Sequence, residues 1–181
     1  DIDELPQKCA LDDGHLACVV GGMGSGREFV VFDENTGREL ARASFPGRTP
    51  DTALLGEVVA VDGLVLVRTG AGRTGPITAF DATANIVWQG TGGEVYPEAG
   101  IVVAQETIDS EVVFLRASDG GEITRAREPV ELTLSPYFWS FYRGGVAVLN
   151  EAVNGTDFYA LDGTRTASLP GWQAVDSPGA V

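Results

Sequence analysis

Cys9 and Cys18 are the residues of this chain with the clearest chemistry, and they bound the segment CALDDGHLAC. At its centre, Asp13-Gly14 is typical of a two-residue type I′ hairpin turn, because both central positions of that turn need positive φ. Counting outward from the turn places the two cysteines opposite each other in a non-hydrogen-bonded pair, about 4.5 Å apart between Cα atoms. We therefore expect a disulfide and an oxidising compartment: extracellular, periplasmic or at the cell surface. The alternative is two reduced, buried cysteines that happen to face each other.

Acid–base and metal chemistry have little support in the sequence. His15, the one histidine of the chain, lies beside the Asp13-Gly14 turn without partner ligands, so neither a hydrolytic triad nor a zinc site is expected. The carboxylates are numerous, but the segments DEN and LDD lack the alternate-residue oxygen ligands of a calcium loop. We expect no catalytic residue, no metal and no cofactor.

The charge balance excludes two classes of partner. The 181 residues include 12 basic and 26 acidic side chains, a net charge of −14, and the basic residues are not clustered. Such a chain is not expected to bind nucleic acid or an anionic membrane surface. No apolar run approaches the roughly 18 residues of a membrane span, so no membrane insertion is expected within this segment.

Two glycine-rich segments, 21–28 and 69–76, resemble phosphate-binding loops at first sight. Neither has the Lys-Ser/Thr ending of a P-loop, and neither precedes a helix, so we interpret both as long hairpin loops that leave a binding role open. Asn154-Gly155-Thr156 fits a glycosylation sequon, but Asn-Gly is also a natural hairpin turn, and the turn is the preferred interpretation unless the source is eukaryotic.

The elements that position these residues repeat along the chain. Four segments read FVVFDENTGREL, ITAFDATANIVW, VVFLRASDGGEI and FYALDGTRTASL. Each contains an apolar strand, then a short polar turn, then a second apolar residue eight positions after the first. The first apolar residues are Phe32, Phe80, Leu115 and Leu161, the residues that follow them are Asp33, Asp81, Arg116 and Asp162, and the second apolar residues are Leu40, Trp88, Ile123 and Leu169. The aspartates are expected to cap the turns rather than act as general acids.

A glycine-containing turn precedes each copy, so each repeat holds four short strands bounded by Gly, Asp, Asn and Pro. Four-stranded antiparallel units repeated about every 40 residues predict an all-β protein, a β-propeller of four blades. The expected blades are residues 7–46, 52–91, 93–129 and 131–170. Residues 171–181 are expected to begin a further strand or form a tail.

The segment Phe80–Trp88, which reads FDATANIVW, is the copy that most resembles the repeat of pyrroloquinoline-quinone-type (PQQ-like) β-propellers, and 32–40 is next. The resemblance covers about residues 10–170. It implies that the Trp-type residue of one blade packs on its neighbour and that the Asp-containing turn joins the third and fourth strands. This chain departs from the family pattern at Arg116, which replaces the aspartate, and in retaining the tryptophan only at Trp88.

The ring is expected to be incomplete. The chain starts at Asp1 without methionine, which suggests a processed or excised segment, and residues 172–175 look like another inner strand. We favour part of a six- to eight-bladed propeller, or one completed by another chain, over a closed four-bladed ring. Exposed terminal blades would then dimerise or bind a partner.

The aromatic segment Ser135–Gly145 is the most unusual stretch, with Tyr137, Trp139 and Phe141 facing one way on a strand. It is either the inner strand of the fourth blade, packed between sheets, or an aromatic surface for a peptide, glycan or protein partner.

The function expected from these observations is that of a secreted or cell-surface, non-enzymatic propeller that binds or scaffolds other proteins. One alternative is a fragment of a quinone-dependent dehydrogenase, although the adjacent cysteines of that class are absent from the sequence. Another is a structural subunit whose copies complete a ring.

Overall fold

The computed structural model describes residues 6–21, 26–45, 55–69, 75–105, 111–127, 138–142 and 144–172. Within these ranges the chain is built from β-strands, with two single-turn 3₁₀ helices, Pro97–Ala99 and Glu151–Val153, as its helical elements. The expectation of an all-β protein is confirmed.

The strands form four separate four-stranded antiparallel sheets, and strands that are consecutive in the chain are neighbours in every sheet. We call these sheets blades 1 to 4. Blade 1 contains β1 (Pro6–Asp12), β2 (His15–Val20), β3 (Glu28–Asp33) and β4 (Glu39–Ser44), and blade 2 contains β5 (Leu55–Val61), β6 (Leu64–Thr69), β7 (Ile77–Phe80) and β8 (Ile86–Gly90). Blade 3 contains β9 (Gly93–Tyr96), β10 (Ile101–Gln105), β11 (Val112–Arg116) and β12 (Glu122–Ala126), and blade 4 contains β13 (Trp139–Tyr142), β14 (Gly145–Asn150), β15 (Gly155–Ala160) and β16 (Arg165–Pro170).

In blades 1 and 2, the turn that joins the first two strands lies at the Asp-Gly pair of the sequence. Asp13 and Gly14 both have positive φ, 40° and 81°, as do Asp62 and Gly63, 51° and 75°. These are the backbone signs of a type I′ turn, whose twist matches that of the two strands that it joins.

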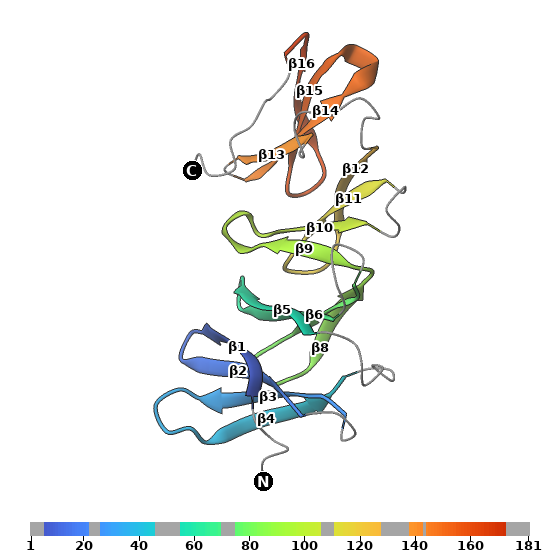
Figure 1. The fold of residues 1–181 in the computed structure, drawn as a ribbon. Coiled ribbons are helices and arrows are strands. Elements are labelled where there is room, and N and C mark those ends of the chain that lie inside the picture. Colours follow the sequence, from blue (N-terminus) through green and yellow to red (C-terminus); the bar gives the residue numbers. More distant parts are fainter. Residues whose placement is uncertain are drawn as a thin grey trace.

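The blades follow one another in chain order, from blade 1 near the N-terminus to blade 4 near the C-terminus, and the row does not close into a ring (Figure 1). The molecule is therefore an open, partial β-propeller, as expected, and not a closed four-bladed ring.

Most of the apolar core lies in the three junctions between successive blades, and a fourth cluster, Cys18, Val20 and Val30 with Phe32 beside it, is buried on the other face of blade 1. Because side chains alternate across a strand, each inner blade contributes one face to the junction before it and the other face to the junction after it. Blades 1 and 2 bury Ala17, Val19, Phe29, Val31, Val65, Val67, Phe80 and Ala84 between them. Blades 2 and 3 bury Leu66, Ala79, Trp88, Val95, Val102 and Ala117, and blades 3 and 4 bury Ile101, Val103, Phe114, Ile123, Trp139, Val146 and Val148.

Every blade has the same irregularity between its third and fourth strands. The register shifts where one residue of the fourth strand is unpaired, and these residues are Leu40, Val87, Ile123 and Thr166. A bulge of this kind bends the strand and increases its twist. Residues that are eight positions apart in each copy of the repeat are therefore not always at equivalent positions in the strand pairing.

The fourth copy shows the difference most clearly. The backbone bonds that close the turn start at Asp33, Asp81 and Arg116 in blades 1 to 3 but at Ala160 in blade 4. Leu161 therefore lies in the turn, one residue after β15 ends. Tyr159 occupies the position that the spacing of eight residues assigned to Leu161. The prediction for Leu161 was wrong because the turns differ in length by one residue, and because apolar residues continue into the turn of blade 4.

Candidate binding surfaces at the blade junctions and terminal faces

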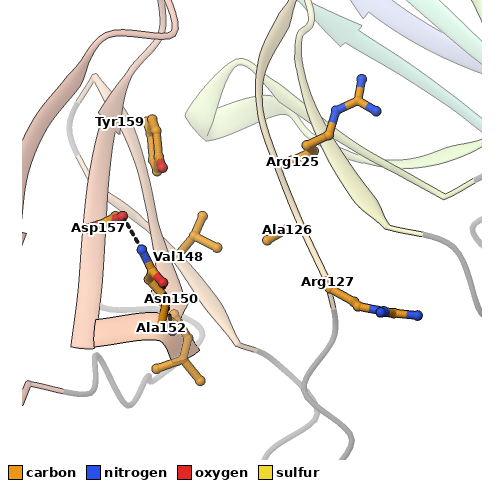
Figure 2. A pocket seen from close by; sticks show the side chains of 9 residues that line it. Arg125, Ala126, Arg127, Val148, Asn150, Ala152, Asp157 and Tyr159 are labelled. Atoms are coloured by element: carbon orange, nitrogen blue, oxygen red, sulfur yellow. Dashed lines mark hydrogen bonds between the residues drawn. The ribbon is translucent and has the colours of Figure 1, made fainter. Parts of the chain in front are cut away.

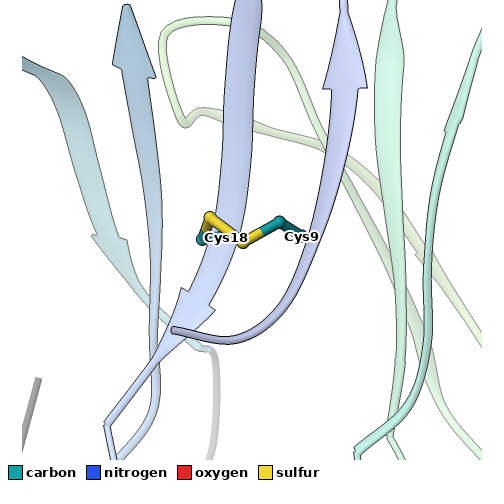
Figure 3. Close-up of a disulfide and its surroundings, with 2 residues drawn as sticks. All are labelled: Cys9 and Cys18. Carbon is teal, nitrogen blue, oxygen red and sulfur yellow. A yellow bond between two sulfur atoms is a disulfide. The ribbon is translucent and has the colours of Figure 1, made fainter. Parts of the chain in front are cut away.

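Cys9 and Cys18 form a disulfide between β1 and β2 (Figure 3). The two residues are directly paired in the register, in the order counted outward from the Asp13-Gly14 turn, and their Cα atoms are 4.1 Å apart. Cys18 is fully buried, whereas Cys9 is exposed. The expected disulfide is confirmed, and it favours an oxidising compartment.

The turn aspartates bind backbone amides of their own turns. The Oδ1 atom of Asp81 accepts bonds from the amides of Thr83 and Asn85, at 2.8 and 2.9 Å. Asp33 accepts in the same way from Thr36 N at 2.8 Å, and Asp162 accepts from Thr164 N at 2.8 Å. These carboxylates order the turns between the third and fourth strands.

The same hydrogen bonds stabilise the ionised carboxylates. Burial raises the pKa of Asp81, but the bonds from Thr83 and Asn85 outweigh burial and hold this pKa below its ordinary value. The side chain and backbone of Thr36 likewise lower the pKa of Asp33. Carboxylates held ionised in this way are poor proton donors at neutral pH.

Blade 3 has Arg116 where the other copies have an aspartate, and Asp119, three residues later, binds the backbone of the turn instead. Asp119 Oδ1 accepts a 2.8 Å bond from Gly121 N and forms an ion pair with Arg116, which lowers the pKa of Asp119. Arg116 also donates a 2.9 Å bond from Nη1 to the carbonyl oxygen of Leu161 in blade 4. The residue that breaks the sequence pattern thus links two blades.

Trp88 makes the most specific contact between blades. Its side chain is 9% exposed, and its indole N–H donates a 2.8 Å bond to the carbonyl oxygen of Ala117 in the turn of blade 3. Gly120 of that turn has φ +69°, and a Cβ atom there would lie 2.8 Å from Trp88 Cδ2. This position therefore requires glycine both for its conformation and for the space that the indole occupies.

A left-handed turn residue recurs in each blade, at Gly37, Ala84, Gly120 and Gly163. Each donates its amide to the turn's first residue, so the four positions are equivalent. Ala84 packs in the core of blades 1 and 2, and a Cβ atom on Gly163 would lie 3.0 Å from the carbonyl oxygen of Ile123 in β12. Three junctions thus place a blade's turn near the preceding blade's fourth strand, whereas Gly37 has nothing within 4 Å of its Cβ position.

On the face of blade 1 opposite blade 2, Cys18, Val20 and Val30 are buried, whereas the apolar side chains next to the Asp13-Gly14 turn are exposed. Leu11 and Leu16 are paired across β1 and β2 on this face, and they are 60% and 37% exposed. Phe32 is half-buried beside them. We call Leu11, Leu16, Phe32 and the Gly37 turn the leading face.

Blade 4 has exposed residues on its face opposite blade 3, along β16 and just after it. All six residues of β16 are exposed, including Leu169 at 42%, and Trp172, just after the strand, is 70% exposed. The Trp172 backbone is held by a 2.8 Å bond from Thr156 Oγ1 to its carbonyl oxygen. We call Ala167, Leu169 and Trp172 the trailing face.

The four apolar residues predicted to anchor blade to blade are therefore in different situations. Trp88 and Ile123 are buried in the junctions, with exposures of 9% and 5%. Leu40, the unpaired bulge residue of β4, is 38% exposed, and Leu169 is 42% exposed on the trailing face.

The aromatic segment of blade 4 lies in the core rather than on a surface. Trp139 is 5% exposed and meets Phe114 of blade 3 edge-on, with ring centroids 5.7 Å apart. Phe141, on the same face, is half-buried against Tyr96, with centroids 4.7 Å apart. Trp139 and Phe141 therefore pack between sheets, and the neighbouring blade covers the rings that a binding partner would need. Tyr137 lies outside the described residues.

A cleft of about 280 Å³ lies between β12 and blade 4 (Figure 2). Its walls are Arg125, Ala126 and Arg127 on one side and Val148, Leu149, Asn150, Ala152, Asp157 and Tyr159 on the other. The side chains of Arg125 and Arg127 extend away from the blade 4 wall in this view. Arg125 also forms ion pairs with Glu122 and Glu111, at 2.5 and 3.7 Å.

Asp157 is the buried charge beside this cleft, with its side chain 3% exposed. Its Oδ2 accepts a 2.7 Å bond from Asn150 and lies 3.4 Å from Arg165, so it connects β14, β15 and β16. Burial raises its pKa, but Ser168, Asn150 and Arg165 together bring it below the ordinary value. Oδ1 has no partner in good hydrogen-bonding geometry, although Ser168 is opposite in the register. The Asp157 carboxylate therefore stabilises the pairing of β14, β15 and β16.

The remaining predicted loops are partly described. Residues 22–25 and 70–74 of the two glycine-rich loops lie outside the described residues. At the sequon, β14 and β15 are joined by the 3₁₀ helix Glu151–Val153 and by Asn154, whose φ is 45°, and Gly155 already begins β15, so Asn-Gly is not the two-residue hairpin turn that was expected. Within the described ranges no three His, Cys, Asp or Glu side chains are grouped as metal ligands, and no helix is long and apolar enough to cross a membrane.

The four sheets define the class of protein, an open β-propeller of four blades. No family model matches the sequence, and no curated protein matches it. Among solved structures, the crystal structure of Citrobacter koseri AztD is similar at 11% sequence identity with a TM-score of 0.43, over 90% of this chain and 46% of that one. This chain thus spans less than half the length of that structure.

Proposed function

We propose that this chain is a non-enzymatic, secreted or cell-surface β-propeller module of the PQQ-like type, which binds protein through its terminal blade faces. The observation that carries the proposal is the open row of blades, because it leaves apolar side chains exposed on the leading face and on the trailing face. Equivalent positions at the internal junctions are buried. Exposed apolar surface of this kind is typical of protein interaction sites.

The disulfide supports the location, since such bonds persist outside the reducing cytoplasm. The PQQ-like assignment is supported by Trp88, which packs on the turn of the next blade as the family resemblance implies. The net charge of −14 supports a protein partner over nucleic acid.

Photo-crosslinking tests the proposal. A photoreactive phenylalanine analogue replaces Leu16 on the leading face or Leu169 on the trailing face, and the full chain is irradiated with and without the extracytoplasmic fraction of its source. The control carries the analogue at Val87, which is 47% exposed but lies within the row of blades. We expect a protein adduct from Leu16 and Leu169 but not from Val87. The absence of an adduct at both terminal faces contradicts the proposal.

The dehydrogenase alternative has its own test. Pyrroloquinoline quinone and calcium are added to the purified chain and the midpoint of thermal unfolding is measured. We expect no shift, whereas a rise of several degrees would show that the folded chain binds the cofactor and would favour the enzyme class.

A further inference from the structure

We propose that the cleft between β12 and blade 4 binds a guanidinium group, the side chain of an arginine on a protein partner, and that the carboxylate of Asp157 recognises its charge. The site lies at an internal junction between two blades, so it is separate from the leading and trailing faces. Three observations support it: the position of Asp157 in the blade, the contacts of its carboxylate, and the walls of the cleft.

Asp157 stands at a position that carries no charge in the other three blades. It lies two residues before the last paired residue of the third strand, and the same position holds Val30, Thr78 and Val113 in blades 1 to 3. Asp157 faces blade 3, since its partner in the register, Val148, belongs to the core between blades 3 and 4. A carboxylate is therefore not required to build a blade or a junction of this kind.

The charge of Asp157 is weakly compensated within the described part of the chain. Its side chain is 3% exposed, and its ion-pair partner there, Arg165, is 57% exposed at a distance of 3.4 Å. Despite burial, hydrogen bonds from Ser168 and Asn150 hold the pKa of Asp157 below its ordinary value, so the carboxylate is ionised at neutral pH. A buried ionised group is stabilised by a close cation, and solvent weakens the pairing with an exposed one. A second cation in the cleft would therefore be bound favourably.

Asn150 orients the carboxylate beside the cleft. Its Nδ2 donates a 2.7 Å bond to Oδ2 of Asp157, while its Oδ1 accepts a 3.0 Å bond from the amide of Ala152. Among the described residues, Oδ1 of Asp157 has no partner in good hydrogen-bonding geometry. A carboxylate accepts up to about four hydrogen bonds, and the parallel N–H groups of a guanidinium group match its two oxygens.

The rest of the cleft suits the stem and the plane of an arginine side chain. Its volume is about 280 Å³, and its walls include the apolar side chains of Ala126, Val148 and Leu149. The ring of Tyr159 lies on the same wall as Asp157 (Figure 2), where a guanidinium plane could stack on it. Lysine would supply the charge but neither the paired hydrogen bonds nor the stacking, so the cleft favours arginine.

The nearest arginines of the chain itself do not serve Asp157 from across the cleft. Arg125 and Arg127 belong to the β12 wall, but their side chains extend away from blade 4 (Figure 2). Arg125 forms ion pairs with Glu122 and Glu111 instead. These arginines leave room beside Asp157 for a cation from another molecule, and the net charge of −14 favours the approach of one.

The test uses N-acetyl-arginine methylamide as the probe and its neutral isostere, N-acetyl-citrulline methylamide, as the matched ligand control. Each is titrated into the isotopically labelled full chain while the amide chemical shifts are recorded by NMR. We expect saturable shifts at Asn150, Ala152 and Tyr159 with the arginine probe, with a dissociation constant of about 1 mM, as for a small fragment. The citrulline probe is expected to bind at least tenfold more weakly, because it lacks the charge.

Two variants test the site from different sides. Asp157→Asn retains the shape of the side chain without its charge, and Ala152→Phe narrows the cleft from an exposed position without changing any charge. Each is expected to weaken binding of the arginine probe at least tenfold. Asp162→Asn is the matched control, because it removes the same charge from an exposed turn of the same blade, and we expect it to leave the dissociation constant unchanged.

Circular dichroism and the thermal midpoint show whether each variant is folded. Because Ala152→Phe leaves the carboxylate of Asp157 in place, it gives an answer even where Asp157→Asn does not fold. Wild-type shifts that do not saturate by about 20 mM probe, equal binding of the citrulline probe, or wild-type affinity in either folded variant each overturns the proposal.

Free arginine, titrated in parallel, distinguishes the source of the guanidinium group. Binding more than tenfold tighter than that of the capped probe would assign the cleft to the free amino acid and overturn the protein partner, whereas equal or weaker binding supports an arginine within a polypeptide. Crosslinking from Leu16 and Leu169 tests the terminal faces separately, so a failure at the cleft leaves the proposed function unchanged.

Discussion

Cys9 and Cys18 stabilise the first hairpin at the scale of single residues. The bond closes a short loop, with a sequence separation of 9, and joins an exposed residue to a fully buried one. Reduction or mutation therefore acts mainly on blade 1, since the bond lies within that blade and not between blades.

For the double variant Cys9→Ala/Cys18→Ala, we expect the free energy of unfolding to fall by about 2.5 kcal/mol, because the unfolded chain regains the freedom of the loop. Urea unfolding followed by circular dichroism measures the difference. Dithiothreitol should lower the stability of the wild type by a similar amount and leave the variant unchanged. A wild-type chain that is insensitive to the reductant would contradict the prediction.

Asp81 shows how the turns respond to acid. Its pKa in the folded state is lowered by hydrogen bonds from Thr83 and Asn85. A carboxyl group whose folded pKa lies below its unfolded value stabilises the protein above the unfolded pKa, and this stabilisation is lost as the pH falls through the folded pKa. Asp33, Asp119, Asp157 and Asp162 have lowered pKa values as well, so their effects have the same sign.

We therefore expect the free energy of unfolding to fall as the pH drops below about 4, near the unfolded pKa of these aspartates. In Asp81→Asn the side-chain oxygen can still accept from the turn, but its charge is gone, so stability should depend less on pH in the acid range. Urea titrations between pH 2.5 and 7 check this. An acid dependence equal to that of the wild type would count against the role given to Asp81.

The fourth strand and its turn decide how one blade meets the next, at the scale of the element. In blade 2, the bulge at Val87 is followed by Trp88, which points into the junction and binds Ala117 of blade 3. In blade 3 the bulge residue Ile123 is itself buried. The junction thus uses whichever apolar residue the bulge turns toward the following blade.

Gly120→Ala tests the junction of blades 2 and 3. The new Cβ would lie 2.8 Å from Trp88 Cδ2 at a residue with φ +69°, so we expect a loss of about 2–4 kcal/mol from conformational strain and overpacking together. Gly37→Ala is the matched control, because Gly37 has φ +66° with nothing within 4 Å, and we expect a loss of only about 1 kcal/mol there. Equal losses in the two variants would show that contact with Trp88 does not contribute.

The molecule as a whole is held together in series, because each blade shares its apolar core with the neighbours before and after it. Blade 4 depends on one such junction, where Trp139 lies between Phe114 and Phe138. Repeat arrangements of this kind gain stability from nearest-neighbour interfaces.

Trp139→Ala is expected to lower the free energy of unfolding by about 3–5 kcal/mol, since it removes a large buried side chain from this junction. Because Trp139 is far from solvent, we do not expect the substitution to act first on partner binding. Chemical denaturation and amide hydrogen exchange in blade 4 provide the readout. A folded variant of wild-type stability would overturn the core assignment.

The sequence alone predicted the local features of this protein. The Asp13-Gly14 turn determines which residues pair across the first hairpin, so the Cys9–Cys18 bond could be derived by counting. The repeated apolar strands and polar turns predicted four-stranded blades for the same reason, since short-range turn chemistry and alternation specify them.

Tertiary structure alone decided which residues are equivalent and which are covered. The bulges after each turn shift the register, and Leu40 is partly exposed whereas Trp88 is buried, although a constant spacing of eight gives these two residues the same place; the length of the turn puts Leu161 in the turn of blade 4. It also decided that the row of blades stays open and that Trp139 is covered by blade 3. Burial depends on what the neighbouring blade places over a side chain, and that neighbour is distant in the sequence.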